Sequence, residues 1–146
     1  MKNFAILFST LCLLFNISYS QPSNITVDAG AYYFNPDPIE IEVGSTVTWI
    51  NVGGLHDVNG VTNTLTGDSF GNPEDFYLSP VYAMNADNPV EIGSFTFTIP
   101  GTYNYDCSIG NHAAQGMVGQ IVVNYVAYPG CTDELACNYD VTANED

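Results

Sequence analysis

The chain has 146 residues, of which 16 are aspartate or glutamate and only one, Lys2, is a lysine or arginine, so its formal net charge is −15. Nucleic acids and anionic membrane surfaces are therefore poor partners, because both are bound through clusters of basic side chains. The same acidity would attract a cationic partner, and it would equally well serve only to keep a secreted protein in solution.

The first 20 residues have the pattern of a secretory signal peptide. Lys2 precedes an apolar run over residues 4–15, and the small residues Ser18 and Ser20 stand before Gln21. This run is too short to span a membrane, and no other apolar run is long enough to do so. We therefore expect a secreted or periplasmic protein without membrane insertion, whose folded part begins at Gln21.

Residues 24–125 have the pattern of β structure, with alternating apolar residues and frequent turn signals. The stretch 39–43 alternates apolar and acidic residues, as a strand with one buried face should. Strands are expected over residues 25–29, 39–43, 46–51, 95–99, 102–107 and 117–124. Because no helical period of useful length appears, the sequence predicts an all-β fold, a two-sheet Greek-key β-sandwich.

The stretch 59–93 is the least regular part of this region and is rich in Asn, Gly, Pro and Asp. Within it, Asn72 and Pro73 are suited to the cap and the first position of a short helix. Before it, Gly53 and Gly54 interrupt the strand 46–51 just ahead of His56. The glycines permit the tight turns that would bring a ligand close to an ion.

The candidate metal ligands lie in the segment Cys107 to Met117, which has the spacing C-x4-H-x4-M, and at His56. A thiolate and a thioether are soft ligands that favour Cu(I), whereas two imidazoles also suit Cu(II). Taken singly, each residue has an ordinary alternative: a histidine at the surface, a methionine in the core, or a disulfide from Cys107 to Cys131 or Cys137. The metal site is favoured because His56 and His112 are the only two histidines and both occupy ligand positions. Met84 follows no such pattern, and we expect it to serve in packing.

Two motifs in the chain resemble those of the cupredoxins. The first is residues 46–51 followed by His56 and Asp57, and the second is residues 101–107 followed by His112 and Met117. The plastocyanin/azurin-like copper proteins are the most similar group, and the resemblance covers residues 24–125. It implies a copper-binding domain over residues 21–125 that holds one Cu(I)/Cu(II) ion. His56 and His112 would supply imidazole nitrogens, Cys107 the thiolate and Met117 a weak axial thioether.

The resemblance further implies a one-electron carrier and not an enzyme, since no histidine remains for a catalytic copper centre or a hydrolytic triad. The expected partner is a redox protein with a cationic docking face, and the expected state is a monomer. Small neighbours of His112 would leave its imidazole edge accessible in a flat docking patch. This patch would comprise Gly110, Ala113, Ala114, Gly116 and Leu55.

Asp57 departs from the pattern of plastocyanins, which usually carry Asn after the first ligand. We expect Asp57 to accept a hydrogen bond from the segment of Ser108 and so hold the site rigid. Asp57 and Asp106, if ionised near the metal, would favour Cu(II) and lower the reduction potential. The alternative is that both carboxylates point into solvent, where their charge is screened.

Residues 126–130 are expected to form a linker, and residues 131–146 an acidic tail with little apolar content. The tail resembles a Cys-containing repeat, GCTD…ACNYD, of secreted bacterial proteins, which suggests a fragment of something longer. A small disulfide loop between Cys131 and Cys137 is plausible, whereas the spacing of the tail's acidic residues matches no known calcium loop. The tail supports an alternative function, a copper-binding or sensing module of a larger secreted or cell-surface protein.

Overall fold

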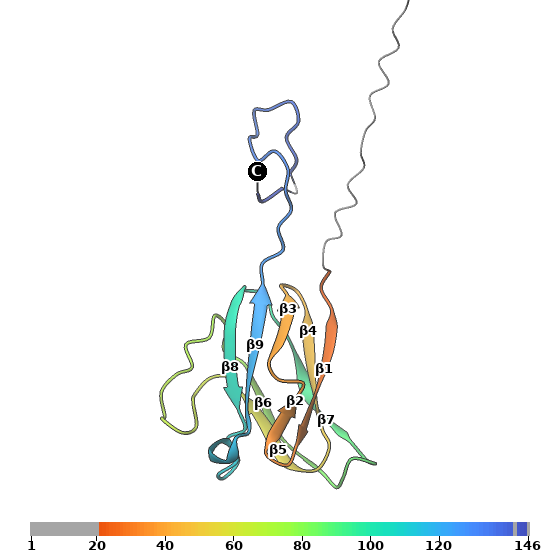
Figure 1. Ribbon diagram of the computed structural model, residues 1–146, viewed down its shortest axis with the longest axis vertical. Helices are drawn as coiled ribbons and strands as arrows, with labels where there is room; N and C mark the ends of the chain where they lie inside the picture. Colours follow the sequence, from red (N-terminus) through yellow and green to blue (C-terminus); the bar gives the residue numbers. More distant parts are fainter. Residues whose placement is uncertain (1–20, 142, 146) are drawn as a thin grey trace, which may run out of the picture.

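Two β-sheets pack face to face in the computed structural model (Figure 1), which describes residues 21–141 and 143–145. The first sheet has the strand order β2-β1-β4-β7 and contains β1 (Asn24–Gly30), β2 (Tyr33–Asn35), β4 (Thr46–Asn51) and β7 (Val90–Thr96). The second has the order β3-β9-β8-β5-β6 and contains β3 (Ile39–Glu42), β5 (Gly54–Asn59), β6 (Tyr77–Ala83), β8 (Gly101–Asp106) and β9 (Val118–Asn124). The predicted two-sheet β-sandwich is confirmed; the predicted signal peptide, residues 1–20, lies outside the described residues.

The core lies between the two sheets and is rich in aromatic side chains. The alternation predicted for 39–43 is observed, since Ile39 and Ile41 are buried and Glu40 is exposed. The largest fully buried side chains include Trp49, Phe97, Tyr103 and Tyr105. The ring of Trp49 lies edge-on to that of Tyr105, with centroids 5.6 Å apart. The aromatic core gives β4 and β8 rigid positions, and β8 leads directly to Cys107.

The connection between β8 and β9 carries the C-x4-H-x4-M segment, and it lies at one end of the sandwich (Figure 1). It contains η1 (Ala113–Gln115), a single turn of 3-10 helix and the only helical element in residues 21–141. Strand β5 lies beside β8 in the same sheet and runs antiparallel to it, with Asn59 opposite Asp106. The beginning of β5, with His56, therefore reaches the same end of the sandwich as Cys107.

Three strands were not predicted. Strand β2 has only three residues, and β6 carries Pro80 without a clear alternation. Strand β5 turns polar residues inward, among them His56 and Asp57, which reverses the pattern that predicts a strand. In addition, the strand predicted over residues 95–99 lies too far along the chain, because the observed strand β7 spans Val90–Thr96.

The short helix predicted at Asn72 is wrong, because residues 72–76 form only bends and coil. The Asn72 side chain is engaged in tertiary contacts and caps no helix. Its Nδ2 donates to the carbonyl oxygens of Gly60 (2.7 Å) and Asn104 (2.8 Å), and its Oδ1 accepts from the backbone N–H of Asn104 (2.8 Å). These bonds fasten the irregular stretch after β5 to strand β8.

The described residues beyond β9 contain neither helix nor strand and lie at the end of the sandwich opposite η1 (Figure 1). Backbone hydrogen bonds within this segment hold it together. The N–H of Gly130 donates to the carbonyl of Glu145 (2.8 Å), and the N–H of Asp140 donates to the carbonyl of Cys131 (3.0 Å). Cys131 pairs with Tyr139, two residues beyond Cys137, and both tail cysteines are free thiols. The Cys131–Cys137 disulfide that the sequence made plausible is therefore not observed. No helix of the described chain is long and apolar enough to cross a membrane.

Candidate metal centre

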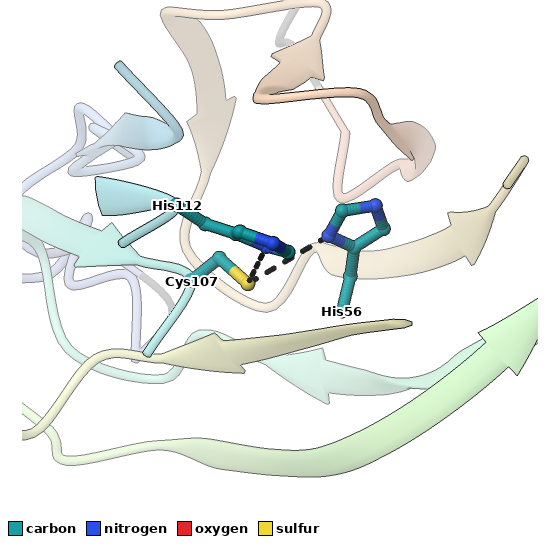
Figure 2. A group of neighbouring side chains, drawn as sticks. All are labelled: His56, Cys107 and His112. Carbon is teal, nitrogen blue, oxygen red and sulfur yellow. Dashed lines mark hydrogen bonds between the residues drawn. The ribbon is translucent and has the colours of Figure 1, made fainter. Parts of the chain in front are cut away.

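His56, Cys107 and His112 converge at the end of the sandwich that carries η1. One ligand atom from each of the three residues lies within 4.8 Å of the others. Cys107 Sγ is 3.7 Å from Nδ1 of His56 and 3.4 Å from Nδ1 of His112 (Figure 2). A thiol between two imidazole nitrogens is a donor set that suits copper, and the three residues fit that ion.

The imidazole of His56 is buried and held in a single orientation. Its Nε2 lies 2.9 Å from the carbonyl oxygen of Gly53. A carbonyl can only accept, so Nε2 carries the proton and Nδ1, which faces Cys107, keeps a free lone pair. Burial lowers the pKa of His56 below its usual value, although the bond to Gly53 opposes this. The net shift is downward, which favours the neutral imidazole that binds a metal.

Backbone hydrogen bonds close the segment between Cys107 and Met117 into a compact loop. The N–H of Cys107 donates to the carbonyl of Met117 (3.1 Å), and the N–H of Met117 donates to the carbonyl of His112 (3.0 Å). Gly116, with φ of 100°, turns the chain after η1 in a conformation that favours glycine. Met117 is fully buried at the base of this loop, while its role as a ligand stays a prediction.

The thiol of Cys107 is fully buried, and burial raises its pKa to about 11. The negative charge of Asp57 acts in the same direction. Since copper binds the thiolate, the metal must displace this proton, and affinity should fall as the pH falls. Cys107 is not joined to Cys131 or Cys137, so the disulfide alternative is wrong.

Asp57 joins the two ligand segments, as predicted. The backbone N–H of Ser108 donates to Oδ1 of Asp57 at 2.7 Å, and the Ser108 hydroxyl donates to Oδ2. The hydroxyl of Tyr77 also approaches Oδ2, at 3.4 Å. Asp57 is fully buried, so the alternative that it points into solvent is wrong. Asp57 thus accepts hydrogen bonds from three donors.

Asp106, the residue before Cys107, is likewise buried, and it fastens a different part of the chain. Its Oδ1 accepts from Nδ2 of Asn59 (3.0 Å) and the hydroxyl of Thr64 (2.8 Å). Its Oδ2 accepts from the backbone N–H of Thr64 at 2.7 Å. The roles of Asn59 and Thr64 were not predicted, because nothing in a polar, irregular stretch marks the two side chains that fold back onto β8.

The surface beside His112 is an apolar hollow of about 250 Å³. It is lined by Ala31, Tyr32, Gly53, Gly54, Leu55, His56, Ile109 and His112. The predicted patch is confirmed for Leu55, which is 42% exposed and lines the hollow. Gly110, Ala114 and Gly116 are exposed but do not line the hollow. The prediction is wrong for Ala113, which is buried because η1 turns this side chain inward. Met84 is 74% exposed, so the expectation that it serves in packing is also wrong.

Comparison with known proteins agrees with this site. A sequence profile for copper binding proteins, plastocyanin/azurin family, matches residues 22–124. The chain is 38% identical to plastocyanin of Scenedesmus fuscus over 97 residues, which are 66% of this chain and 91% of that protein. It is 27% identical to chloroplastic plastocyanin of Oryza sativa subsp. indica over 121 residues, 82% and 73% of the two chains. Among solved structures, an oxidized mutant of amicyanin aligns at 30% identity with a TM-score of 0.47, covering 69% of this chain and 82% of that one.

Proposed function

Because the chain belongs to the plastocyanin/azurin family of copper-binding proteins, we propose that it carries single electrons between redox partners outside the cytoplasm. The observation that carries the proposal is the convergence of the Cys107 thiol with one nitrogen each of His56 and His112. Copper is the cofactor of such a site, and it supplies one-electron chemistry because both Cu(I) and Cu(II) are stable. The location outside the cytoplasm is supported by the signal-peptide pattern of residues 1–20.

We assign four ligands: His56, Cys107, His112 and, as the weak axial ligand, Met117. Three of them are constrained by bonds that do not involve a metal. The carbonyl of Gly53 fixes the ring of His56, and Asp57 fixes the segment that follows Cys107. The backbone of Met117 is hydrogen-bonded through both its N–H and its carbonyl oxygen. Ligands held in this way move little when one electron arrives, which keeps electron transfer fast.

The electron would enter and leave through His112. This ligand is half-exposed and borders the apolar hollow, whereas Cys107 and His56 are buried. An apolar surface suits brief encounters because it requires little desolvation of charge. The single basic residue of the chain lies within residues 1–20, and the acidic remainder favours a partner with a cationic face. We also propose that the protein acts as a monomer. We propose that it is not an enzyme, since both histidines of the chain belong to this centre and none remains for catalysis.

Addition of Cu(II) to the purified apo-protein tests the proposal. We expect an intense blue band from charge transfer between Cys107 and copper, absent in Cys107→Ala and retained with a shifted maximum in Met117→Leu. Stopped-flow mixing with a one-electron reductant should then bleach the band reversibly. A colourless protein would refute the copper assignment, and a blue protein that is not bleached would refute the electron-carrier role alone.

A second candidate is a copper-binding module of a larger secreted protein. The tail favours it, since the described residues beyond β9 lie at the end opposite the metal centre and would leave His112 free (Figure 1). Electron exchange with a reductase and an oxidase of the same compartment distinguishes the two. Exchange with both would support the carrier, whereas copper binding without exchange would support the module.

A further inference from the structure

Tyr32 lies in a strained turn directly beside the metal centre. Gly30 pairs with Tyr33, so Ala31 and Tyr32 form the two-residue connection between β1 and β2. Tyr32 has φ of 66° and is the only residue other than glycine with a positive φ in the described part of the chain. A side chain with a Cβ is disfavoured in this conformation, which glycine adopts freely. Such conformations persist where the surrounding structure enforces them, and they are found often at functional sites.

The strained turn holds the ring of Tyr32 against His112. The two ring centroids are 5.2 Å apart, and the ring planes meet at 79°. This edge-on arrangement is a favourable contact between aromatic rings. Tyr32 is 42% exposed and lines the hollow together with His112, so its ring forms part of the surface around the exposed ligand.

The two histidines differ in what orients them. Nε2 of His56 is bonded to the carbonyl of Gly53 at 2.9 Å. For His112, the described residues offer Nε2 no hydrogen-bond partner, and Nδ1 faces Cys107 Sγ. Metal-binding histidines are ordinarily oriented by a partner on the nitrogen that does not bind the metal. The ring of His56 also lies beside His112, with centroids 5.0 Å apart, and Tyr32 is the ring from outside the ligand set that constrains His112 in place of such a bond.

We propose that Tyr32 is a positioning residue for His112, whose ring contact fixes the plane of the exposed imidazole in place of a hydrogen bond. The inference deepens the proposed function and rests on His112 being a copper ligand. The contact needs the aromatic ring and not the hydroxyl. Phenylalanine at this position should therefore preserve it, and a residue without a ring should abolish it.

The test compares four variants with the parent protein. Tyr32→Phe keeps the ring, Tyr32→Gly removes the ring and relieves the turn, and Tyr32→Asn removes the ring in a residue that tolerates positive φ. Tyr125→Asn is the matched control, because Tyr125 is an exposed tyrosine that follows β9, at the end of the sandwich opposite η1 (Figure 1). Measurements are the NMR signals of the His112 ring in the apo-protein, the urea midpoint, the EPR spectrum, and the rate of copper transfer to EDTA.

We expect Tyr32→Gly and Tyr32→Asn to lose copper about tenfold faster, with a changed EPR spectrum and shifted, broadened His112 signals. The urea midpoint of Tyr32→Gly should be no lower than that of the parent, because the turn is relieved. Tyr32→Phe and Tyr125→Asn should match the parent in copper transfer. The inference would be overturned if Tyr32→Gly and Tyr32→Asn kept the parental rate of copper transfer and the parental His112 signals. It would also be overturned if their urea midpoints fell in parallel with the faster loss of copper. If the parent itself binds no copper, the proposed function fails, and unchanged apo-protein His112 signals would separately refute the contact.

Discussion

The metal centre is assembled from two segments of different character. The segment around His56 belongs to strand β5; its imidazole is buried and bonded to the carbonyl of Gly53. The segment from Cys107 to Met117 is a loop, and its His112 is half-exposed beside an apolar hollow. The buried histidine anchors the site, and in the proposed function the more exposed one faces the partner. The carboxylate of Asp57 joins the two segments.

The largest effect should come from breaking that connection with Asp57→Ala. Two donors of Ser108, its backbone N–H and its hydroxyl, would lose a buried charged acceptor. Hydrogen bonds to charged groups contribute roughly 1.5–3 kcal/mol each, so the free energy of unfolding of the apo-protein should fall by about 3 kcal/mol. Urea unfolding at neutral pH measures it. A loss below about 1 kcal/mol would show that the two segments are held together elsewhere.

Asp57→Asn is the matched variant, since it keeps an acceptor for Ser108 and removes the charge. A buried negative charge beside the thiolate favours Cu(II), so its removal should raise the reduction potential, on the order of 50 mV or more. Cyclic voltammetry of the copper-loaded protein measures it. An unchanged or lower potential would mean that Asp57 acts only as a brace and contributes nothing electrostatically.

The second effect concerns the buried thiol of the loop segment. Its pKa is raised by burial from 9.0 to about 11, so the protonated thiol stabilises the folded apo-protein. That stabilisation is complete below pH 9 and is lost as the pH rises toward 11, amounting to about 2–3 kcal/mol. Buried tyrosines shift in the same direction, so the difference between the parent and Cys107→Ala isolates the thiol. Parallel stability curves between pH 8 and 11 would contradict the assignment.

A third prediction contrasts the glycines that serve the two segments. Gly54 and Gly116 have φ of 97° and 100°, so alanine should cost about 1–2 kcal/mol at either position. A Cβ on Gly54 would lie 3.0 Å from Nε2 of His56, whereas a Cβ on Gly116 would meet nothing within 4 Å. Copper affinity, measured by competition with a chelator, should therefore fall in Gly54→Ala and stay near the parental value in Gly116→Ala. Equal copper affinities would show that His56 is less constrained than its bond to Gly53 implies.

Ala114→Lys should have the smallest effect on the structure. It tests whether electron transfer uses the surface of the loop from Cys107 to Met117. Ala114 is exposed, so stability should change by less than about 0.5 kcal/mol and the blue colour should remain. Reduction by a cationic cobalt or ruthenium complex should slow at low salt, and this difference should shrink as salt is added. The same substitution at the tail, Ala136→Lys, is the control. Equal rates of reduction for both variants would mean that electrons do not enter beside His112.

Much of the fold was predictable because hydrophobic alternation reports burial wherever one face of a strand meets an apolar core. Strands β3, β4, β8 and β9 follow this rule and were predicted nearly as observed. Strand β5 could not be found in this way, because its inward side chains serve the metal centre. The helix predicted at Asn72 failed for a related reason, since a cap-forming side chain can also bond to a distant strand.

The residue types and spacing in the chain were enough to predict copper and the fold class, because both depend on local patterns of residues. The bond between Asp57 and Ser108 was predicted from the resemblance to plastocyanins. The chain's own pattern could not predict the bonds from Thr64 to Asp106 or the contact of Tyr32 with His112. Both join residues that are far apart in the sequence, and distances in the folded protein do not depend on spacing along the chain.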